Sequence, residues 1–407
     1  MSSFSDNLES GDQDLASGER AFSLLVQRVG CPIRDTVPPH VTVASADAIR
    51  HFARAYGDGN PLYSDPVYAM ASPRAGLCAP PLFGLATGTP RPPADPEDMV
   101  DMDQVPGGRA QTILLDRWAL TRPIWEGTRL NRDKVLLDAA VESDSGGPTC
   151  VVTERTVYSA DDVVYAVRDR SRRFRLVPVA KPAVVPVQRT QYSPEYLAEI
   201  ERAYDTESRR GAEPLHIEDV SVGNHLGPLV KGPLTVTDLV EYRSGVGPGP
   251  LGGEALALAH ANRRQRPELY ASDAWGVPDI IERRHWDEKF AESLGLLSAT
   301  DYSHTRMTWF SHLVTDWMGN GGWLRELSGV TNLGANYVGD THWLEGEVVA
   351  ISDRGRIGEV GLALSGRNQR SELTCRADAV VVLPKRPATS VTEQDLEALP
   401  GDAGVVV

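Results

Sequence analysis

Two short stretches of the chain carry titratable side chains whose types and spacing suit acid/base chemistry. The first contains Asp58 and, five residues later, Tyr63. The second contains His285, which follows the carboxylates Asp279 and Glu282. An imidazole and a carboxylate that converge on one water molecule can move protons to and from a substrate. A phenol with a pKa of about 10 is a hydrogen-bond donor at neutral pH but a poor proton shuttle. We therefore expect proton transfer in the second stretch.

Other common chemistries find little support in the sequence. His304 and His312 stand eight residues apart, so they do not form the pair at three or four residues that binds metal on one helix face. Residues 247–252 match the pattern GxGxxG, but a helix-like segment precedes them and two prolines interrupt the loop, which argues against a dinucleotide site. The cysteines are scattered singly and predict free thiols: Cys31, Cys78, Cys150 and Cys375. We expect neither a metal site nor a resident cofactor.

The net charge and the distribution of apolar residues argue against several classes of partner and location. The 407 residues contain 41 basic and 56 acidic side chains, a net charge of −15, which argues against nucleic acid or an anionic membrane as the main partner. No run of about 18 apolar residues suggests a membrane span, and the N-terminus does not resemble a secretory signal. We expect a cytoplasmic protein.

Hydrophobic periodicity indicates the elements that position these residues. Ile49, Phe52, Ala53 and Tyr56 recur at helical spacing after a capping Ser45. Residues 118–177 are rich in β-branched side chains and broken by turn clusters, which predicts an antiparallel sheet. The apolar stripe within 301–324 predicts a long central helix in the second half, and it includes His304 and Arg306 near its start.

The second half repeats the plan of the first. Residues 234–247 resemble 44–57 with a shift of 190, and 285–291 resemble 63–69 with a shift of 222. Residues 339–351 resemble 127–139 with a shift of 212. Three matches in the same order indicate a duplicated unit with an insertion between the first two matches.

The first stretch resembles the signature of the MaoC-like (R)-specific enoyl-CoA hydratases, Gly-Asp-x-Asn-Pro-x-His-x-Asp. The matching residues are Gly57, Asp58, Asn60, Pro61, Asp65, Ala69, Ala79 and Pro80. Tyr63 stands where that family has its catalytic histidine. In the second half His285 occupies the histidine position, but the aspartate position is Ile280.

The resemblance implies an α+β fold, a tandem double hot-dog in which two antiparallel sheets each wrap around a central helix. We expect the two halves to share one continuous sheet with both helices on one face. The expected boundaries are a disordered tail at 1–19, an N-terminal hot-dog domain at 20–180, a linker and helix at 181–210, a C-terminal hot-dog domain at 211–386 with an insertion at about 248–280, and a disordered tail at 387–407.

The resemblance also assigns roles to residues, and three arrangements stay open. The second half can be active with His285 and either Asp279 or Glu282. Asp58 can instead meet His285 across the two halves. In the third arrangement, hydratase chemistry has been lost and the chain binds an acyl-like ligand or transforms it differently. The residues expected to bind substrate are Tyr63, Asn60, His304 and Arg306.

The activity implied is that of a hydro-lyase acting on a 3-hydroxyacyl or 2-enoyl thioester. No cofactor is expected beyond the CoA or carrier-bound phosphopantetheine that belongs to the substrate. An acyl carrier protein is a candidate partner, and a homodimer is the expected assembly. The alternatives are an acyl-binding protein without activity, or a hot-dog enzyme with thioesterase, isomerase or cyclase chemistry.

Overall fold

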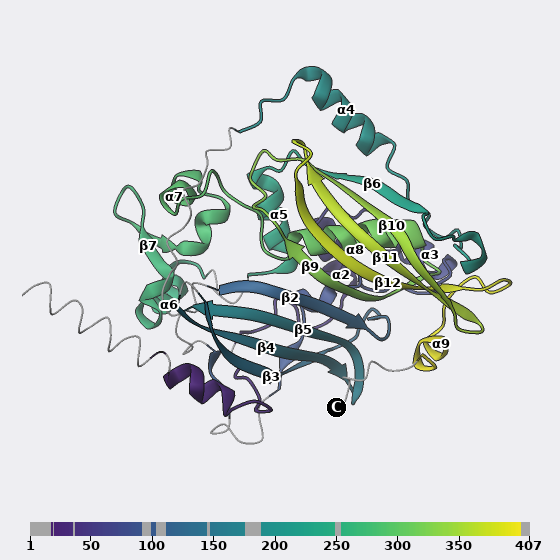
Figure 1. Ribbon diagram of the computed structural model, residues 1–407. Helices are drawn as coiled ribbons and strands as arrows, with labels where there is room; N and C mark the ends of the chain where they lie inside the picture. Colours follow the sequence, from purple (N-terminus) through teal and green to yellow (C-terminus); the bar gives the residue numbers. More distant parts are fainter. Residues whose placement is uncertain are drawn as a thin grey trace, which may run out of the picture.

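Among the residues that the structure describes, one curved sheet of ten strands runs through both halves. The computed structural model describes residues 18, 20–35, 37–91, 99–102, 111–144, 147–175, 189–248 and 254–399. The strand order is β1-β3-β4-β5-β2-β9-β12-β11-β10-β6 (Figure 1). The two halves join where β2 pairs antiparallel with β9, with Trp118 opposite Leu327. The expected continuous sheet is therefore present.

The strands of the first half are β1 (Thr89–Pro90), β2 (Gln111–Leu120), β3 (Asn131–Asp144), β4 (Gly147–Ala160) and β5 (Val163–Arg175). Those of the second half are β6 (His225–Lys231), β9 (Trp323–Asn332), β10 (His342–Asp353), β11 (Ile357–Asn368) and β12 (Leu373–Pro384). All neighbouring pairs in the sheet are antiparallel except β1 with β3.

The elements follow the sequence repeat. Helix α2 (Ala46–Ala55) and helix α5 (Val236–Val246) begin 236 − 46 = 190 residues apart. Helix α3 (Pro66–Ala71) and helix α7 (Glu288–Ser293) are 288 − 66 = 222 apart, and β2 and β9 are 323 − 111 = 212 apart. Helices α2 and α5 pack so closely that a Cβ on Gly245 would lie 2.4 Å from the carbonyl oxygen of His51.

A long central helix lies in the second half. In the second half, α8 (Thr305–Met318) lies inside the curve of β9–β12 and is buried along almost its whole length. Between α3 and β2, the described residues of the first half include the short helix η2 (Phe83–Leu85) and β1, while 92–98 and 103–110 lie outside the described residues. The central helix that the sequence predicted for the second half is therefore present. The core packs apolar residues from both halves around α8, among them Phe52, Trp118, Phe310 and Leu344.

Three connecting regions complete the fold. Helix α4 (Pro194–Asp205) lies in the segment expected as a linker and helix. The insertion forms helix α6 (Leu256–Gln265), then the hairpin of β7 (Tyr270–Ser272) and β8 (Pro278–Ile280). The expectation of a disordered tail from residue 387 is wrong for 387–399, because Val391 is buried there and α9 (Glu393–Glu397) packs on the first half. The expected tail at 1–19 lies almost wholly outside the described residues. None of the helices described is long and apolar enough to cross a membrane.

Candidate functional site

The predicted residues gather in two clusters near opposite ends of α8. His285, Glu282 and His304 lie near the N-terminal end of this helix, and Asp58 lies against His312 in its C-terminal half. Eight residues separate His304 from His312, a rise of about 12 Å along the helix axis. The contacts of Asp58 and His285 are with different groups, so the structure does not bring these two together as an acid/base pair.

His285 is fixed in one orientation by its surroundings. It ends the short 3-10 helix η7 (Ile281–His285), and its Nδ1 lies 2.8 Å from the carbonyl oxygen of Thr300. Its ring stacks on Tyr302 with centroids 4.2 Å apart. A carbonyl can only accept a hydrogen bond, so Nδ1 carries the proton and Nε2 keeps its lone pair. Burial lowers the pKa of His285 to about 4, which leaves the imidazole neutral and able to accept a proton at pH 7.

Glu282 is the carboxylate that accompanies His285. The two side chains stand three residues apart on η7, where positions i and i+3 lie on one face, and both are buried. Arg243 at the end of α5 lies 2.6 Å from Glu282 Oε1, and it also contributes to the lowered pKa of His285. Oε2 of Glu282 has no hydrogen-bond partner among the residues described. One carboxylate oxygen is therefore held by Arg243 and the other is available.

Asp279 lies outside this arrangement. About half of its side chain is exposed, its Oδ1 accepts a hydrogen bond from the backbone N–H of Ile280, and it faces Arg283 at 3.9 Å. Of the two carboxylates that the sequence offered as partners for His285, Glu282 is the one directed inward beside it.

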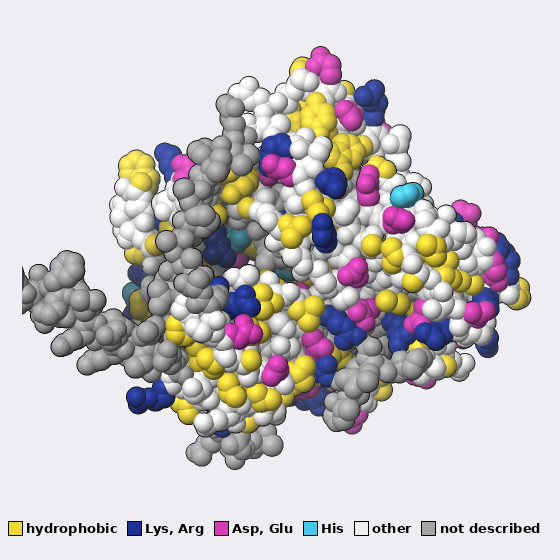
Figure 2. Space-filling view, in the orientation of Figure 1, with side chains coloured by type: hydrophobic (Ala, Val, Ile, Leu, Met, Phe, Trp, Pro, Cys, Tyr) yellow, Lys and Arg dark blue, Asp and Glu magenta, His cyan; other side chains and the backbone are white. Residues whose placement is uncertain are grey.

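His304 joins the first cluster from the N-cap of α8. Its ring centroid lies 5.5 Å from that of Tyr242, which stacks on Tyr302 at 5.6 Å. Burial lowers the pKa of His304 to about 3, and the positive charge of Arg168 contributes to the shift. Arg168 lies on β5, so the sheet of the first half is close to His304. Figure 2 shows a hollow above β2, beside the region of α6 and β7, in which Lys, Arg and His side chains are visible.

Arg306 does not fit the expected role of binding a substrate phosphate. Its guanidinium pairs with Asp301 at 3.1 Å and donates to the carbonyl oxygens of Gly334 and Thr374. Only 3% of the residue is exposed. The expectation is corrected because the donors that would hold a phosphate are committed to a buried network.

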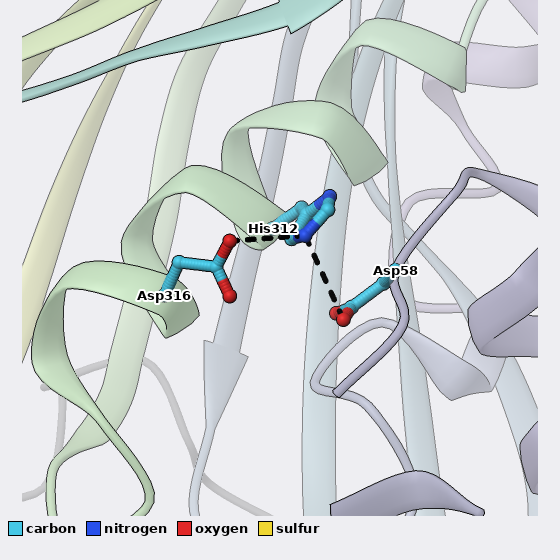
Figure 3. A group of neighbouring side chains, drawn as sticks. All are labelled: Asp58, His312 and Asp316. Carbon is cyan, nitrogen blue, oxygen red and sulfur yellow. Dashed lines mark ion pairs between the residues drawn. The ribbon is translucent and has the colours of Figure 1, made fainter. Parts of the chain in front are cut away.

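The second cluster joins the two halves of the chain. Asp58 Oδ1 lies 3.6 Å from His312 Nε2, and Asp316 Oδ2, one turn along α8, lies 3.1 Å from the same nitrogen (Figure 3). Lys231 Nζ lies 2.8 Å from His312 Nδ1, and Arg209 donates to Asp316 Oδ1 at 2.9 Å. Burial opposes the ionisation of Asp316, but His312 and Arg209 outweigh it and lower the pKa of its carboxyl.

Asn60 and Tyr63 surround this second cluster. Asn60 caps the short helix η1 (Pro61–Tyr63) and donates from its amide to Asn320 Oδ1 at 3.1 Å, a contact between the halves. Tyr63 is buried and lines a cavity of about 20 Å³ with Arg74 and Trp323. Burial raises the pKa of Tyr63 well above its usual value. Asn60 therefore has a structural role in this region.

Sequence reasoning missed Arg243, Tyr302 and His312. Arg243 and Tyr302 come from elements without a motif, and only folding places them beside Glu282 and His285. His312 and Asp316 do stand at i and i+4, a spacing that places two side chains on one helix face. That spacing was the available signal for His312.

Comparisons with known proteins agree with the fold. Residues 29–167 match the family model "FAS1-like, dehydratase domain region". A UPF0336 protein of Parafrankia sp. (strain EAN1pec) is 42% identical over 86 residues, and one of Streptomyces avermitilis is 37% identical over 87. These alignments cover 20% and 21% of this chain, and the chain spans about half the length of these curated relatives, 52% and 54%.

Solved structures match over most of the chain. A MaoC-like dehydratase aligns with a TM-score of 0.55 at 16% identity, covering 89% of this chain and 100% of that one. A protein described as a MaoC domain dehydratase from Chloroflexus aurantiacus aligns with a TM-score of 0.52 at 12% identity, over 88% and 96% of the two chains. A Mycobacterium tuberculosis protein with a double hot-dog fold aligns with a TM-score of 0.50 at 13% identity, over 87% and 96%.

These matches confirm the resemblance that the motif indicated. The chain has the double hot-dog fold that these solved structures share, and residues 29–167 match the FAS1-like dehydratase region.

Proposed function

We propose that the chain is a hydro-lyase that adds water to a 2-enoyl thioester, or removes it from a 3-hydroxyacyl thioester, at His285 and Glu282. The observation that carries the proposal is the arrangement on η7. There a neutral imidazole with a fixed tautomer and a carboxylate with one free oxygen lie on the same face of a short helix. The match of residues 29–167 to the FAS1-like dehydratase region, and a fold shared with a MaoC-like dehydratase, support this class of reaction.

The chemistry needs one proton acceptor and one place for negative charge. In hydration, His285 Nε2 takes a proton from a water molecule that Glu282 Oε2 orients, and the water oxygen bonds to the β-carbon. The electron pair of the double bond moves toward the thioester oxygen, and the α-carbon then takes a proton from the imidazolium. The N-terminal end of α8 carries partial positive charge, which stabilises the enolate-like oxygen. Dehydration follows the same steps in reverse.

We place the acyl thioester in the hollow beside α6 (Figure 2), with its reacting carbons at His285 and Glu282. His304 lies one residue before α8, and about a fifth of the Arg243 side chain is exposed. The substrate would bring its own CoA or carrier-bound phosphopantetheine. Because Arg306 is committed to Asp301, a carrier phosphate would have to meet other groups at this opening.

The test is turnover of a panel of short, long and polycyclic 2-enoyl-CoA thioesters by the full chain. Loss of the enoyl absorbance should require His285, and His285→Ala should lower kcat/KM by about 100- to 10,000-fold. His51→Ala is the matched control, because His51 is an exposed histidine on α2. Equal rates for His285→Ala and the wild type would refute the assignment.

One contact favours the alternative of acyl binding without turnover. Arg284 Nε lies 3.3 Å from His285 Nε2, the atom that must accept the proton, and Ile280 stands where the family has its aspartate. If Arg284 keeps that position, acyl thioesters should raise the melting temperature without being hydrated. Measuring both melting temperature and turnover on the same panel distinguishes the two functions.

A further inference from the structure

A band of charged side chains crosses the inner face of the sheet in the first half, the face that also carries Trp118 of the core. Side chains directly opposite one another on neighbouring strands share a face. Asp116 on β2 and Glu154 on β4 both lie opposite Arg170 on β5. Trp118 lies opposite Arg168, two residues before Arg170. The band comprises five residues: Asp116, Glu154, Arg168, Arg170 and Arg172.

The band separates two apolar clusters of the core. On one side Trp118 and Tyr158 stack with ring centroids 5.5 Å apart and belong to the main cluster. On the other side Val152 and Phe174 belong to a second cluster. Arg170 is the most exposed of the five charged residues, with 26% of its side chain accessible. It is therefore the member of the band that a ligand can best reach.

Both carboxylates beside Arg170 are already bound by another arginine. Arg168 donates to the two oxygens of Asp116, at 2.8 and 2.5 Å. Arg172 lies 2.5 Å from Glu154 Oε1. Arg170 stays 3.8 Å from Asp116 Oδ2, and its buried Nε has no hydrogen-bond partner among the described residues. Since a buried donor of a charged group is costly to leave unpaired, the geometry leaves room for one further acceptor.

The charges of the band do not balance by themselves. Three guanidinium groups face two carboxylates, which leaves one positive charge at Arg170 in a chain whose net charge is −15. Burial lowers the pKa of Arg170 to about 10, and the positive charge of Arg168 contributes, yet the group stays protonated at neutral pH. One carboxylate would neutralise this charge and match the planar fork of a guanidinium. A phosphate dianion would instead leave the band with net negative charge.

The band faces the cluster that contains His285. The positive charges of Arg168 and Arg170 both contribute to the lowered pKa of His304, so the two guanidinium groups lie close to the N-terminal end of α8. The ring of His304 lies 6.3 Å from that of Tyr302, which stacks on His285. A ligand in the hollow of Figure 2, with its reacting carbons at His285, can therefore extend across the inner face of the sheet toward Arg170.

We propose that Arg170 binds a carboxylate at the far end of the acyl chain, so that the substrate is a thioester whose acyl group carries a second acid function. This inference rests on the proposed function for the thioester end of the ligand and adds the chemical class of the other end. Arg170 would donate through Nε and one Nη to the two carboxylate oxygens. The apolar clusters on either side of the band suit the carbon chain between the two ends. Arg170 then determines specificity and takes no part in proton transfer.

Binding of saturated thioesters tests this role without any turnover. Adipyl-CoA, suberyl-CoA and sebacyl-CoA are titrated calorimetrically into the full chain, each beside the methyl-ended thioester of the same length: hexanoyl-CoA, octanoyl-CoA and decanoyl-CoA. We expect at least one carboxyl-ended thioester to bind about 10- to 100-fold more tightly than its counterpart, the range of a hydrogen bond to a charged group. The preference should persist with acyl-pantetheine thioesters, which carry no phosphate. Equal affinities within every pair would overturn the proposal.

Variants then assign the preference to one residue. Arg170→Gln should weaken binding of the carboxyl-ended thioester about 10- to 100-fold and leave the methyl-ended one nearly unchanged. The matched control is Arg173→Gln, because side chains alternate along β5 and Arg173 pairs with Glu142 on the opposite face. The control should keep the preference. If Arg170→Gln weakens both members of a pair equally, Arg170 contacts the CoA moiety or only supports the fold, and the proposal is overturned.

The outcomes separate this inference from the hydro-lyase reaction. A preference for the carboxyl-ended thioester without turnover of the matching 2-enoyl thioester would refute the reaction and support the role of Arg170. Turnover without any such preference would refute only the role of Arg170. The comparison of thioesters on the wild-type chain stands even if a variant does not fold.

Discussion

The Nδ1 atom of His285 lies 2.8 Å from the carbonyl oxygen of Thr300, four residues before His304 at the N-cap of α8. This hydrogen bond couples the orientation of the imidazole to the start of the central helix. It also fixes which nitrogen can accept a proton, because Nδ1 carries the hydrogen and only Nε2 then has a lone pair. The proposed reaction depends on this relationship.

Activity should respond to pH through His285. Its pKa is lowered to about 4, mainly by burial, so the imidazole is neutral and competent as a base down to that pH. We expect kcat/KM to stay level from neutral pH to about 5 and to fall about tenfold per unit below about 4, where the ring becomes protonated. The measurement is a pH profile with brief exposure to acid. A fall centred at pH 6 to 7 would contradict a buried, depressed histidine as the base.

Tyr63→Phe should keep turnover within about tenfold of the wild type. The phenol is buried against the small cavity near Arg74, and burial raises its pKa, so it stays protonated and moves no proton at neutral pH. Removing one neutral hydrogen-bonding group costs about 1 kcal/mol. The assay is steady-state kinetics on the thioester that the wild type prefers. An inactive variant that still binds substrate would move the reaction to the first half of the chain.

His342 should make the fold sensitive to acid. It is fully buried, neither ring nitrogen has a partner within the described part of the chain, and burial lowers its pKa to about 3. In the unfolded chain the imidazole of His342 binds a proton with a pKa of about 6.5. The free energy of unfolding therefore keeps its full value above that pH and falls as the pH drops from there toward 3.

The comparison for this prediction is His342→Leu. Between pH 7 and pH 5 the wild type should lose about 2 kcal/mol more unfolding free energy than the variant. Urea unfolding at the two pH values measures the difference. Identical losses in both proteins would show that His342 is not buried as a neutral ring.

Arg283 should anchor the insertion. Its guanidinium donates to the carbonyl oxygens of Ala271 and Ser272 on the hairpin and lies 4.0 Å from the ring centroid of Phe290. Arg283→Met should speed amide exchange in 270–280 and change KM, since Glu282 and His285 lie on the same short helix. Arg264→Met, an exposed change on α6, is the control and should leave exchange in the hairpin unaltered.

The two halves should not fold separately. Trp118 on β2 pairs with Leu327 on β9, Trp323 Nε1 donates to the carbonyl oxygen of Leu120, and Asp58 meets α8. Separate expression of 1–190 and 191–407 should give insoluble or unfolded fragments, because each would expose an unpaired edge of the sheet and half of the core. Co-expression should recover a complex. Two independently soluble halves with sharp spectra would contradict this expectation.

The sequence by itself determined the repeat, the fold family and the local elements. Period and capping are local properties, so Ser45 predicted the start of α2 and the apolar stripe predicted α8. The motif around Asp58 pointed to the double hot-dog fold because its residues are contiguous in the chain.

Only the tertiary structure decided which residues meet. Glu282 and Asp279 are three residues apart in the chain, yet one turns toward Arg243 and the other toward solvent. The sequence predicted that Arg306 could bind a phosphate. In the folded chain its guanidinium instead contacts Asp301, Gly334 and Thr374. Asp58 and His312 are separated by more than 250 residues and touch because pairing of β2 with β9 brings the first half against α8. Contacts of this kind are set by packing between distant segments, which no local pattern encodes.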